Sequence, residues 1–344
     1  MIAAALAGGL VSADDVVWRD VSVEQIGRSH SVYRLSVADA PRAVLKAFQA
    51  RRGETDGELA RERAVASLAS MCKPLADILA PSMAWYGAAN VIVTQAVEGV
   101  IAWSIDRHGG GELEPSLAWS DLVALLAPRL AAMHRATRNL AAPGTAPHPV
   151  LTGPIPWGLR LFDGDAPADV WQTPALGRLL AEMAADRTLV SGIRTARSNW
   201  RHLCLIHGDL KHDNILVRTS GSEPSLTIVD WEMARIGDPA WDLAALAARL
   251  RLASFGDEAW TDDNMHGCAL LVQTYARASG LNASALVRRL VLYIGAWLLM
   301  VAIQHRSTLS QDDAGNSVSP IVASAASTFR NAERLTASLL ERSE

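Results

Sequence analysis

The residues best suited to chemistry form a polar cluster, residues 207–214, that is flanked on both sides by apolar segments. A further apolar segment downstream ends at Asp230. Asn214 and Asp230 offer the oxygen ligands that Mg²⁺ prefers, and Asp209 remains free to accept a proton. A polar loop held between strands is a common place for catalytic groups. The pattern therefore predicts phosphoryl transfer.

Phosphoryl transfer also requires a cation that reaches the nucleotide phosphates. The chain contains 29 Arg and only three Lys. Codon bias accounts for an excess of Arg, but it also makes each remaining lysine a candidate position for a compact ammonium group in place of a guanidinium group. Lys73, just before Pro74, is interpreted as structural. Lys46 lies on an expected strand, and the helix expected after that strand carries Glu62 as its ion-pair partner. Glu58, four residues earlier on the same helical face, is the alternative partner.

These residues lie in motifs that resemble those of the aminoglycoside phosphotransferase family, within the protein-kinase-like superfamily. The motifs are His207-Gly208-Asp209 with Asn214 five residues later, Val229-Asp230-Trp231-Glu232, and Gly237–Ala244. The resemblance spans about Gly27 to Leu250. It implies a kinase-like fold with ATP and Mg²⁺ as cofactors.

The resemblance implies a role for each matched residue. Lys46 is expected to bind the α- and β-phosphates, with Glu62 as its orienting partner. Asp209 is expected to be the catalytic base. Asn214 and Asp230 are expected to bind Mg²⁺.

Further roles follow from the same resemblance. Asp242 is expected to brace the catalytic loop. The hinge between the two lobes is expected at residues 94–98, with Gln95 and Val97 contacting the adenine ring.

The turn expected to cover the phosphates departs from the pattern of protein kinases. Protein kinases have the sequence G-x-G-x-x-G there, whereas this chain has one glycine, Gly27. Backbone N–H groups and the hydroxyl groups of Ser29 and Ser31 are expected to bind the phosphates instead.

Lys211 follows the expected base by two residues. Ser/Thr protein kinases place at this position a lysine that neutralises the transferred phosphoryl group, and small-molecule kinases more often have His. His212 is the next residue here. We therefore count Lys211 as a candidate catalytic residue, with an ordinary surface charge as the alternative.

The elements that position these residues predict an α+β fold with two lobes. The N-terminal lobe, 1–98, is expected to be a small antiparallel sheet with one helix at 54–68. The expected strands are 16–18, 32–37, 43–48, 83–86 and 91–94. The C-terminal lobe, 99–344, is expected to be mainly helical, with long helical stretches that include 117–137 and 176–191. This lobe is expected to hold the acceptor site, the catalytic loop 205–217 and the metal-binding strand end 226–232. The strands at 215–217 and 226–229 are expected to form a hairpin.

Composition excludes several classes of protein. The net charge is −4 without runs of like charge, so no nucleic-acid or membrane surface is indicated. The three cysteines lack metal-ligand spacing, which favours a reduced, cytoplasmic setting. The apolar run Leu290–Ile303 is shorter than the roughly 20 residues needed to cross a bilayer and predicts a buried core helix.

The acceptor hydroxyl is left open between two hypotheses. One acceptor is a small natural product, such as an aminoglycoside-like compound or an amino alcohol. The other is a Ser/Thr side chain of a ribosomal precursor peptide, phosphorylated before a separate partner lyase completes a dehydration, as in class V lanthipeptide-like pathways. The placement of Lys211 and the segment 28–35 favour the peptide. A catalytically silent kinase-like scaffold is a third, weaker hypothesis.

Overall fold

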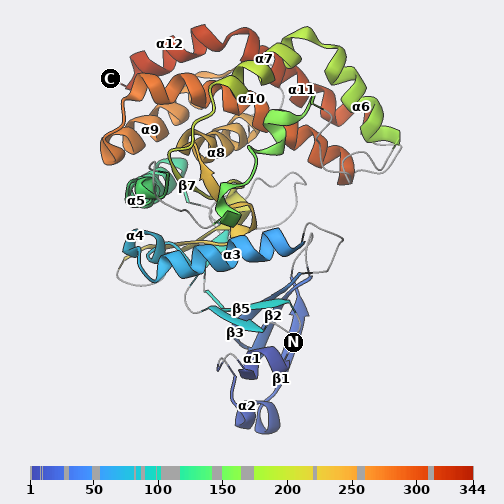
Figure 1. The fold of residues 1–344 in the computed structure, drawn as a ribbon, viewed down its shortest axis with the longest axis vertical. Helices are drawn as coiled ribbons and strands as arrows, with labels where there is room; N and C mark the ends of the chain where they lie inside the picture. The colour runs from blue at the N-terminus through green and yellow to red at the C-terminus, as the bar shows by residue number, and fades with distance from the viewer. Residues whose placement is uncertain are drawn as a thin grey trace. The chain divides into compact units, whose positions relative to one another are not determined.

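Two compact units make up the chain, the N-terminal unit (Met1–Ala102 and Asp213–Ala234) and the C-terminal unit (Trp103–His212 and Arg235–Glu344). The structure is a computed structural model (Figure 1). It describes residues 2–7, 9, 11–26, 31–48, 55–80, 83–86, 90–97, 99–101, 117–141, 149–163, 174–219, 223–253, 260–308 and 314–343.

A five-stranded antiparallel sheet is the centre of the N-terminal unit. Its strands are β1 (Val21–Gln25), β2 (Ser31–Val37), β3 (Ala40–Ala47), β4 (Met83–Tyr86) and β5 (Val91–Gln95), in the order β1-β2-β3-β5-β4. The turn between β2 and β3 contains Ala38 and Asp39, both with positive φ, as a tight hairpin requires. The strands predicted at 32–37, 43–48, 83–86 and 91–94 are confirmed.

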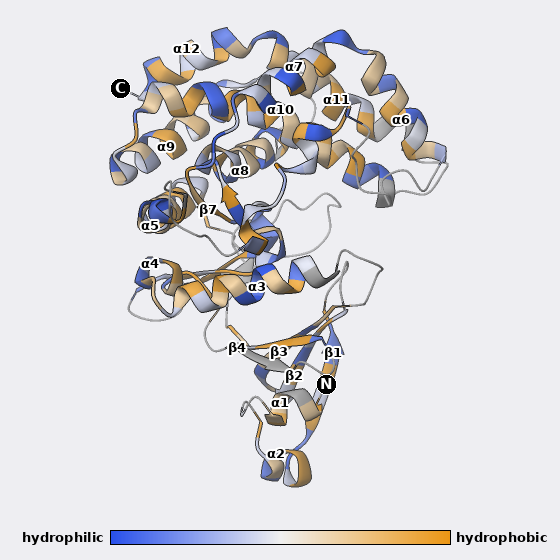
Figure 2. Ribbon diagram, viewed as in Figure 1, coloured by the Kyte–Doolittle hydropathy of each residue, from blue (hydrophilic) through white to orange (hydrophobic). Residues whose placement is uncertain are grey.

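The two faces of this sheet are covered by different helices. Leu45 and Val93 point to the face where Ala5 of α1 (Ile2–Ala7) packs. Lys46 and Ile92, one residue along each strand, point to the opposite face because side chains alternate in a strand. Helix α3 (Thr55–Ala69) lies on that side, and it mixes hydrophobic and hydrophilic residues (Figures 1 and 2). Alternation therefore directs Lys46 toward α3.

The first predicted strand, 16–18, is wrong. These residues end helix α2 (Ala13–Trp18). Ser12 accepts a hydrogen bond from the backbone of Asp15, and the Asp15 carboxylate accepts one from the backbone of Ser12. This capping box starts a helix that overrides the β preference of the apolar residues that follow it.

The predicted hairpin is confirmed, and it belongs to the N-terminal unit. Strand β8 (Ile215–Arg218) pairs with β9 (Ser225–Ile228) and with β6 (Val100–Ile101). The backbone N–H of Ile228 donates to the carbonyl of Ile78, just after α4 (Lys73–Ala76), at 2.6 Å. The structure thus groups 213–234 with the N-terminal residues, whereas this segment was expected in the C-terminal lobe, 99–344.

Helices form most of the C-terminal unit. They are α5 (Trp119–Ala136), α6 (Pro174–Ala185), α7 (Arg187–Ser198), α8 (Pro239–Ala253), α9 (Asp262–Ser279), α10 (Ala283–Thr308), α11 (Ala314–Arg330) and α12 (Ala332–Ser343). The predicted stretch 176–191 divides between α6 and α7, because Asp186 caps the N-terminus of α7 by accepting from Thr188 and Leu189. Short 3₁₀ helices η2 (Arg138–Ala141), η3 (Pro149–Thr152) and η4 (Trp157–Arg160) connect α5 to α6.

The predicted core helix is confirmed in α10, which packs against α7, α8, α11 and α12. In the part of the chain that the structure describes, its segment Ala283–Arg306 is the one helix long and apolar enough to cross a membrane. Of its most apolar window, 89% is buried inside the protein. Burial in the protein core therefore explains why this helix is apolar.

Candidate active site

Lys46 is the centre of an ion-pair cluster in the N-terminal unit. Its Nζ atom donates hydrogen bonds to Glu62 Oε1 and Glu232 Oε2, each at 2.6 Å, and to Asp230 Oδ1. Only 11% of the Lys46 side chain and 7% of the Glu62 side chain are exposed. Three carboxylates thus share one ammonium group.

Burial and charge act in opposite directions on the pKa values of this cluster. Burial lowers the pKa of Lys46, but the three carboxylates outweigh it and hold the pKa above its ordinary value. Burial raises the pKa of Glu62 to about 7, and Lys46 offsets only part of that effect because Asp230 and Glu232 add negative charge. A second cation in the cluster would relieve this repulsion.

The structure places Glu62, and not Glu58, against Lys46. The charge of Glu58 acts instead on Arg61, whose pKa is lowered by burial and raised again in part by Glu58 and Glu232. Arg61 donates from Nε to the backbone carbonyl of Glu232. This bond attaches α3 to η7 (Trp231–Met233) and so holds Glu62 beside Lys46.

The three carboxylates around Lys46, one from α3 and two that follow β9, form a donor set that fits a divalent cation. Carboxylate oxygens of Glu62, Asp230 and Glu232 lie within 4.8 Å of one another. Asp230 has φ of 70°, a left-handed conformation that turns the backbone sharply where the strand ends. The Val229 N–H donates to the Asn214 carbonyl at 2.9 Å, which places the two predicted ligands on adjacent backbone segments. Oxygen donors of this kind suit Mg²⁺.

The predicted base and Lys211 form an ion pair in the C-terminal unit. Lys211 Nζ lies 2.7 Å from Asp209 Oδ2. The Asp209 backbone N–H donates to Nδ1 of His207, which is fully buried, so His207 supports the loop from within. The short 3₁₀ helix η6 (His212–Asn214) then leads along the chain from Lys211 to Asn214.

Asp242 of α8 holds the backbone of the predicted catalytic loop by hydrogen bonds. Its Oδ2 atom accepts from the His207 N–H at 2.8 Å, and its Oδ1 atom accepts from the Gly208 N–H at 3.0 Å. Gly208 has φ of 84°, a conformation that glycine adopts readily. Trp241 donates from its indole nitrogen to the Gly208 carbonyl at 3.0 Å. The N–H and the carbonyl group of Gly208 are therefore both held by hydrogen bonds.

Two further side chains stand behind Asp242. His134 of α5 is buried, with Nε2 3.4 Å from Asp242 Oδ2 and Nδ1 2.9 Å from the Tyr275 hydroxyl of α9. Helices α5, α8 and α9 are thus joined by polar contacts beneath the loop that carries Asp209.

Two of the expected nucleotide contacts, Ser31 and Gln95, lie at the ends of interior strands of the sheet. Gln95 is exposed at the end of β5, and Val97 is half-buried two residues later. Ser31 opens β2, where it pairs with Ala47, the neighbour of Lys46. Ser29 lies outside the described residues.

Sequence reasoning assigned no role to Glu232, Arg61 or His134. Glu232 follows Asp230 by two residues, and this spacing was the available signal for a second carboxylate in the cluster. Arg61 precedes Glu62, and its contact with Glu232 joins residues 171 positions apart. His134 is a single polar residue on the apolar face of α5, which gives no signal of its contact with Asp242.

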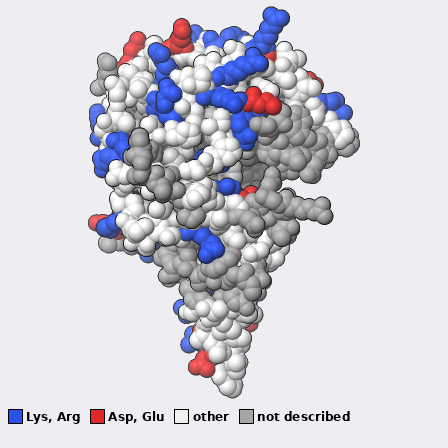
Figure 3. Space-filling view, in the orientation of Figure 1, with Lys and Arg blue, Asp and Glu red and all other residues white. Residues whose placement is uncertain are grey.

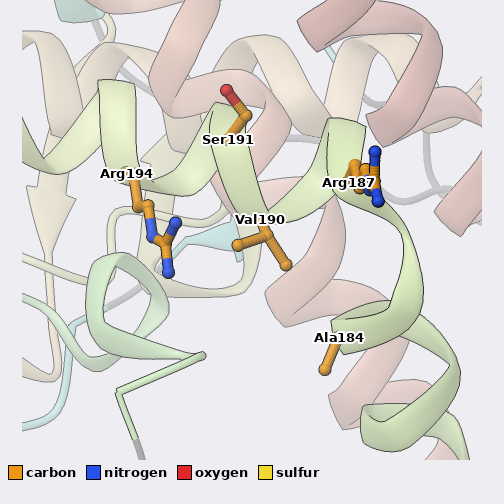
Figure 4. A pocket seen from close by; sticks show the side chains of 5 residues that line it. All are labelled: Ala184, Arg187, Val190, Ser191 and Arg194. Carbon is orange, nitrogen blue, oxygen red and sulfur yellow. The ribbon is translucent and has the colours of Figure 1, made fainter.

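Two hollows in the C-terminal unit have none of the predicted catalytic, metal-binding or nucleotide-binding residues among their lining residues. One, of about 330 Å³, is lined by Ala184, Arg187, Val190, Ser191 and Arg194. In Figure 4, Ser191 points away from Val190 and Arg194, so these side chains do not converge on one point. The other, of about 270 Å³, has the lining residues His134, Arg138, Leu203, Cys204, Pro239, Tyr275 and Leu281. Neither hollow has a carboxylate among its described lining residues. On the face of the C-terminal unit seen in Figure 3, the blue surface of Lys and Arg is more extensive than the red surface of Asp and Glu.

Comparison with known proteins agrees with this geometry. The model of the phosphotransferase enzyme family matches residues 22–281, more than half of the chain. The chain belongs to this family. The predicted kinase-like fold and phosphotransferase class are therefore confirmed, and ATP with a divalent cation is the cofactor set of this class of enzyme.

Individual relatives are more distant. Viomycin phosphotransferase from Streptomyces vinaceus is 37% identical over 101 residues, which are 27% of this chain and 33% of that protein. The match thus spans about a third of the curated relative. A microcompartment-associated aminopropanol kinase has a similar fold, with a TM-score of 0.61, 18% identity and coverage of 97% of this chain and 98% of that one. The GDP complex of aminoglycoside 2′-phosphotransferase-IIIa gives a TM-score of 0.55 at 17% identity, covering 95% and 97% of the two chains.

Proposed function

We propose that the protein is an ATP- and Mg²⁺-dependent O-phosphotransferase that acts on a hydroxyl group of a small, amine-bearing natural product. The observation that carries this proposal is the binding of the buried Lys46 ammonium by Glu62, Asp230 and Glu232. A cluster with one cation and three carboxylates suits a site that takes up a divalent cation together with nucleotide phosphates.

Each residue has a defined task in this reaction. Lys46 binds the α- and β-phosphates, and Glu62 orients it. Asn214 and Asp230 hold Mg²⁺, which supplies neutralisation of phosphate charge when bound. Asp209 accepts the acceptor proton while the hydroxyl oxygen bonds to the γ-phosphorus and the bond to the β–γ bridging oxygen breaks, releasing ADP.

The nucleotide is held at both ends. We assign the adenine contacts to the end of β5, at Gln95 and Val97, and the phosphate contacts to the turn that carries Ser29 and Ser31. Backbone N–H groups of such a turn bind phosphate without adding charge.

The names of two relatives support an amine-bearing acceptor, since one is an aminopropanol kinase and one an aminoglycoside phosphotransferase. The ion pair between Lys211 and Asp209 limits where the amine lies. A protonated amine close to Asp209 would be repelled by Lys211. We therefore place the amine at a distance from the hydroxyl that is phosphorylated.

A precursor peptide is the second candidate acceptor, and Lys211 is the observation that favours it. Its ammonium group, 2.7 Å from the base, is placed where Ser/Thr protein kinases have a lysine. In this case the product is a phosphoserine or phosphothreonine that a separate lyase eliminates. The three free cysteines are consistent with a cytoplasmic enzyme in either case.

An ADP-release assay tests the proposal. The purified protein with ATP and Mg²⁺ is offered amino alcohols, aminoglycosides and Ser/Thr-containing precursor peptides, and mass spectrometry locates the added phosphate. Asp209→Asn should abolish turnover, and Asp263→Asn, at an exposed position in α9 outside the polar cluster, is the control. Phosphate on a peptide alone would reject the small-molecule acceptor. Equal ADP release by the chain and by Asp209→Asn would reject phosphotransfer by this site.

A further inference from the structure

Phe48 lies against the ammonium group of Lys46. The Nζ atom is 5.0 Å from the centroid of the Phe48 ring, within the range of a cation–π interaction. Only 4% of Phe48 is exposed, so little water competes for the ring. The ring and the three carboxylates thus surround the same cation.

The position of the ring is set by the elements that also position the ion pair. Phe48 packs in one cluster with Leu59 and Ile92. Ile92 is the residue opposite Lys46 in the pairing of β3 with β5. Leu59 precedes Glu62 by three residues on α3, so it lies on the same side of the helix. The ring therefore packs with Ile92, which lies opposite Lys46, and with Leu59, which lies on the same side of α3 as Glu62.

The ring attracts the cation in a way that the carboxylates do not. An ammonium group has three N–H donors, and Glu62, Asp230 and Glu232 accept one hydrogen bond each. The face of an aromatic ring attracts the positive charge without using a donor. The attraction to Phe48 therefore persists when N–H groups turn from the carboxylates to nucleotide phosphates.

We propose that Phe48 is a positioning residue that holds the Lys46 ammonium group in place while its hydrogen-bond partners change. This rests on the proposed role of Lys46 as a phosphate ligand. An aliphatic residue at position 48 fills the cluster but lets the ammonium group move, so nucleotide binding weakens and acceptor binding does not.

The test compares Phe48→Leu with Phe48→Tyr. Phe48→Leu should weaken binding of Mg²⁺ with the non-hydrolysable analogue AMP-PNP, measured by calorimetry, by about two- to thirtyfold. It should raise the KM for ATP by a similar factor and leave the KM for the acceptor unchanged. Phe48→Tyr keeps an aromatic face, so its AMP-PNP affinity should stay within about twofold of that of the unaltered chain.

The matched control is Leu59→Val, which removes a methylene from the same cluster and keeps the ring. Thermal unfolding of each variant confirms that it folds. Equal AMP-PNP affinity in the unaltered chain and Phe48→Leu overturns the role of Phe48, as does an equal loss in Phe48→Leu and Leu59→Val. Absence of AMP-PNP binding in the unaltered chain instead contradicts the proposed function itself, which keeps the two failures distinguishable.

Discussion

Asp242 and Gly208 are joined by a hydrogen bond of 3.0 Å from the Gly208 N–H to Oδ1 of a fully buried carboxylate. The other carboxylate oxygen accepts from His207. Both oxygens of Asp242 are therefore used by consecutive backbone N–H groups, immediately before Asp209. The loop geometry depends on a side chain that does not take part in the reaction.

Asp242→Asn should impair catalysis more than nucleotide binding. An asparagine keeps one acceptor and turns an N–H₂ donor toward the second backbone N–H, which leaves that group without a partner. We expect kcat to fall at least tenfold and the unfolding free energy to fall by about 1–3 kcal/mol. The KM for ATP should change little because the Lys46 cluster belongs to the N-terminal unit. Steady-state kinetics and urea unfolding measure both effects.

The matched control for this change is Asp186→Asn. Asp186 also accepts two backbone N–H groups, as the N-cap of α7, but through a single oxygen, and asparagine is an equally good N-cap. It should leave kcat unaffected. Unchanged kcat in Asp242→Asn would show that the loop does not need this brace.

Lys46→Arg should damage nucleotide use although the chain uses Arg at most cationic positions. A guanidinium group is planar and larger than an ammonium group, so it cannot donate to three carboxylates converging on one point. We expect kcat/KM for ATP to fall at least tenfold, measured by ADP release at varied ATP.

Lys73→Arg is the control for this substitution. Lys73 pairs with Asp77 across one helical turn with 84% of its side chain exposed, a setting in which Arg serves equally well. It should keep the activity of the unaltered chain. Full activity in Lys46→Arg would remove the proposed requirement for a compact cation.

Cys268 should make the stability fall at alkaline pH. Burial in α9 raises the pKa of its thiol from 9.0 to about 12. The unfolded chain therefore loses this proton near pH 9, and the folded chain keeps it to about pH 12. Stability from this group is complete below pH 9 and is lost as the pH rises toward 12.

The measurement is urea unfolding of the unaltered chain and of Cys268→Ala from pH 7 to 10.5. The difference in unfolding free energy should stay constant below pH 8 and then decrease by about 1.4 kcal/mol per pH unit well above pH 9. A difference that stays constant across the whole range would mean that the thiol ionises equally in both states.

Local patterns narrowed the ion-pair partner of Lys46 to Glu62 or Glu58, and the family resemblance favoured Glu62. Strand alternation and helix spacing place both residues on facing surfaces, and the choice between Glu62 and Glu58 required only the orientation of α3. The hairpin that ends at Asp230 was predictable for the same reason, since its apolar segments and turn are contiguous in sequence.

Contacts between distant segments were not predictable from one sequence. Glu232 contacts Lys46 across 186 residues. Its spacing of two residues from Asp230 was the available signal, and that spacing does not identify Lys46 as its partner. Residues 213–234 belong to the N-terminal unit through contacts with distant segments, which include the pairing of β8 with β6, the packing of η7 on α3 and the hydrogen bond between Ile228 and Ile78. The error at Val16–Trp18 has a different cause, because a capping box at Ser12 determined a structure that the apolar residues alone would not adopt.

The ring of Phe329 in α11 lies against two glycines of neighbouring helices. This contact gives a test of the packing of the helical core. A Cβ atom built at Gly192 of α7 would lie 2.3 Å from the ring, and one at Gly295 of α10 would lie 2.6 Å from it. Gly192→Ala should therefore destabilise the protein by about 1–3 kcal/mol through overpacking. Urea unfolding measures the change.

The control is Gly177→Ala in α6, where nothing lies within 4 Å of an added Cβ. There the methyl group should stabilise the helix by about 0.5–1 kcal/mol, since alanine is the better helix former. Adding Phe329→Leu to Gly192→Ala should recover part of the loss, because the smaller side chain leaves room for the methyl group. If Gly192→Ala is as stabilising as Gly177→Ala, or if the double variant shows simple additivity, the close packing of α7 on Phe329 is wrong.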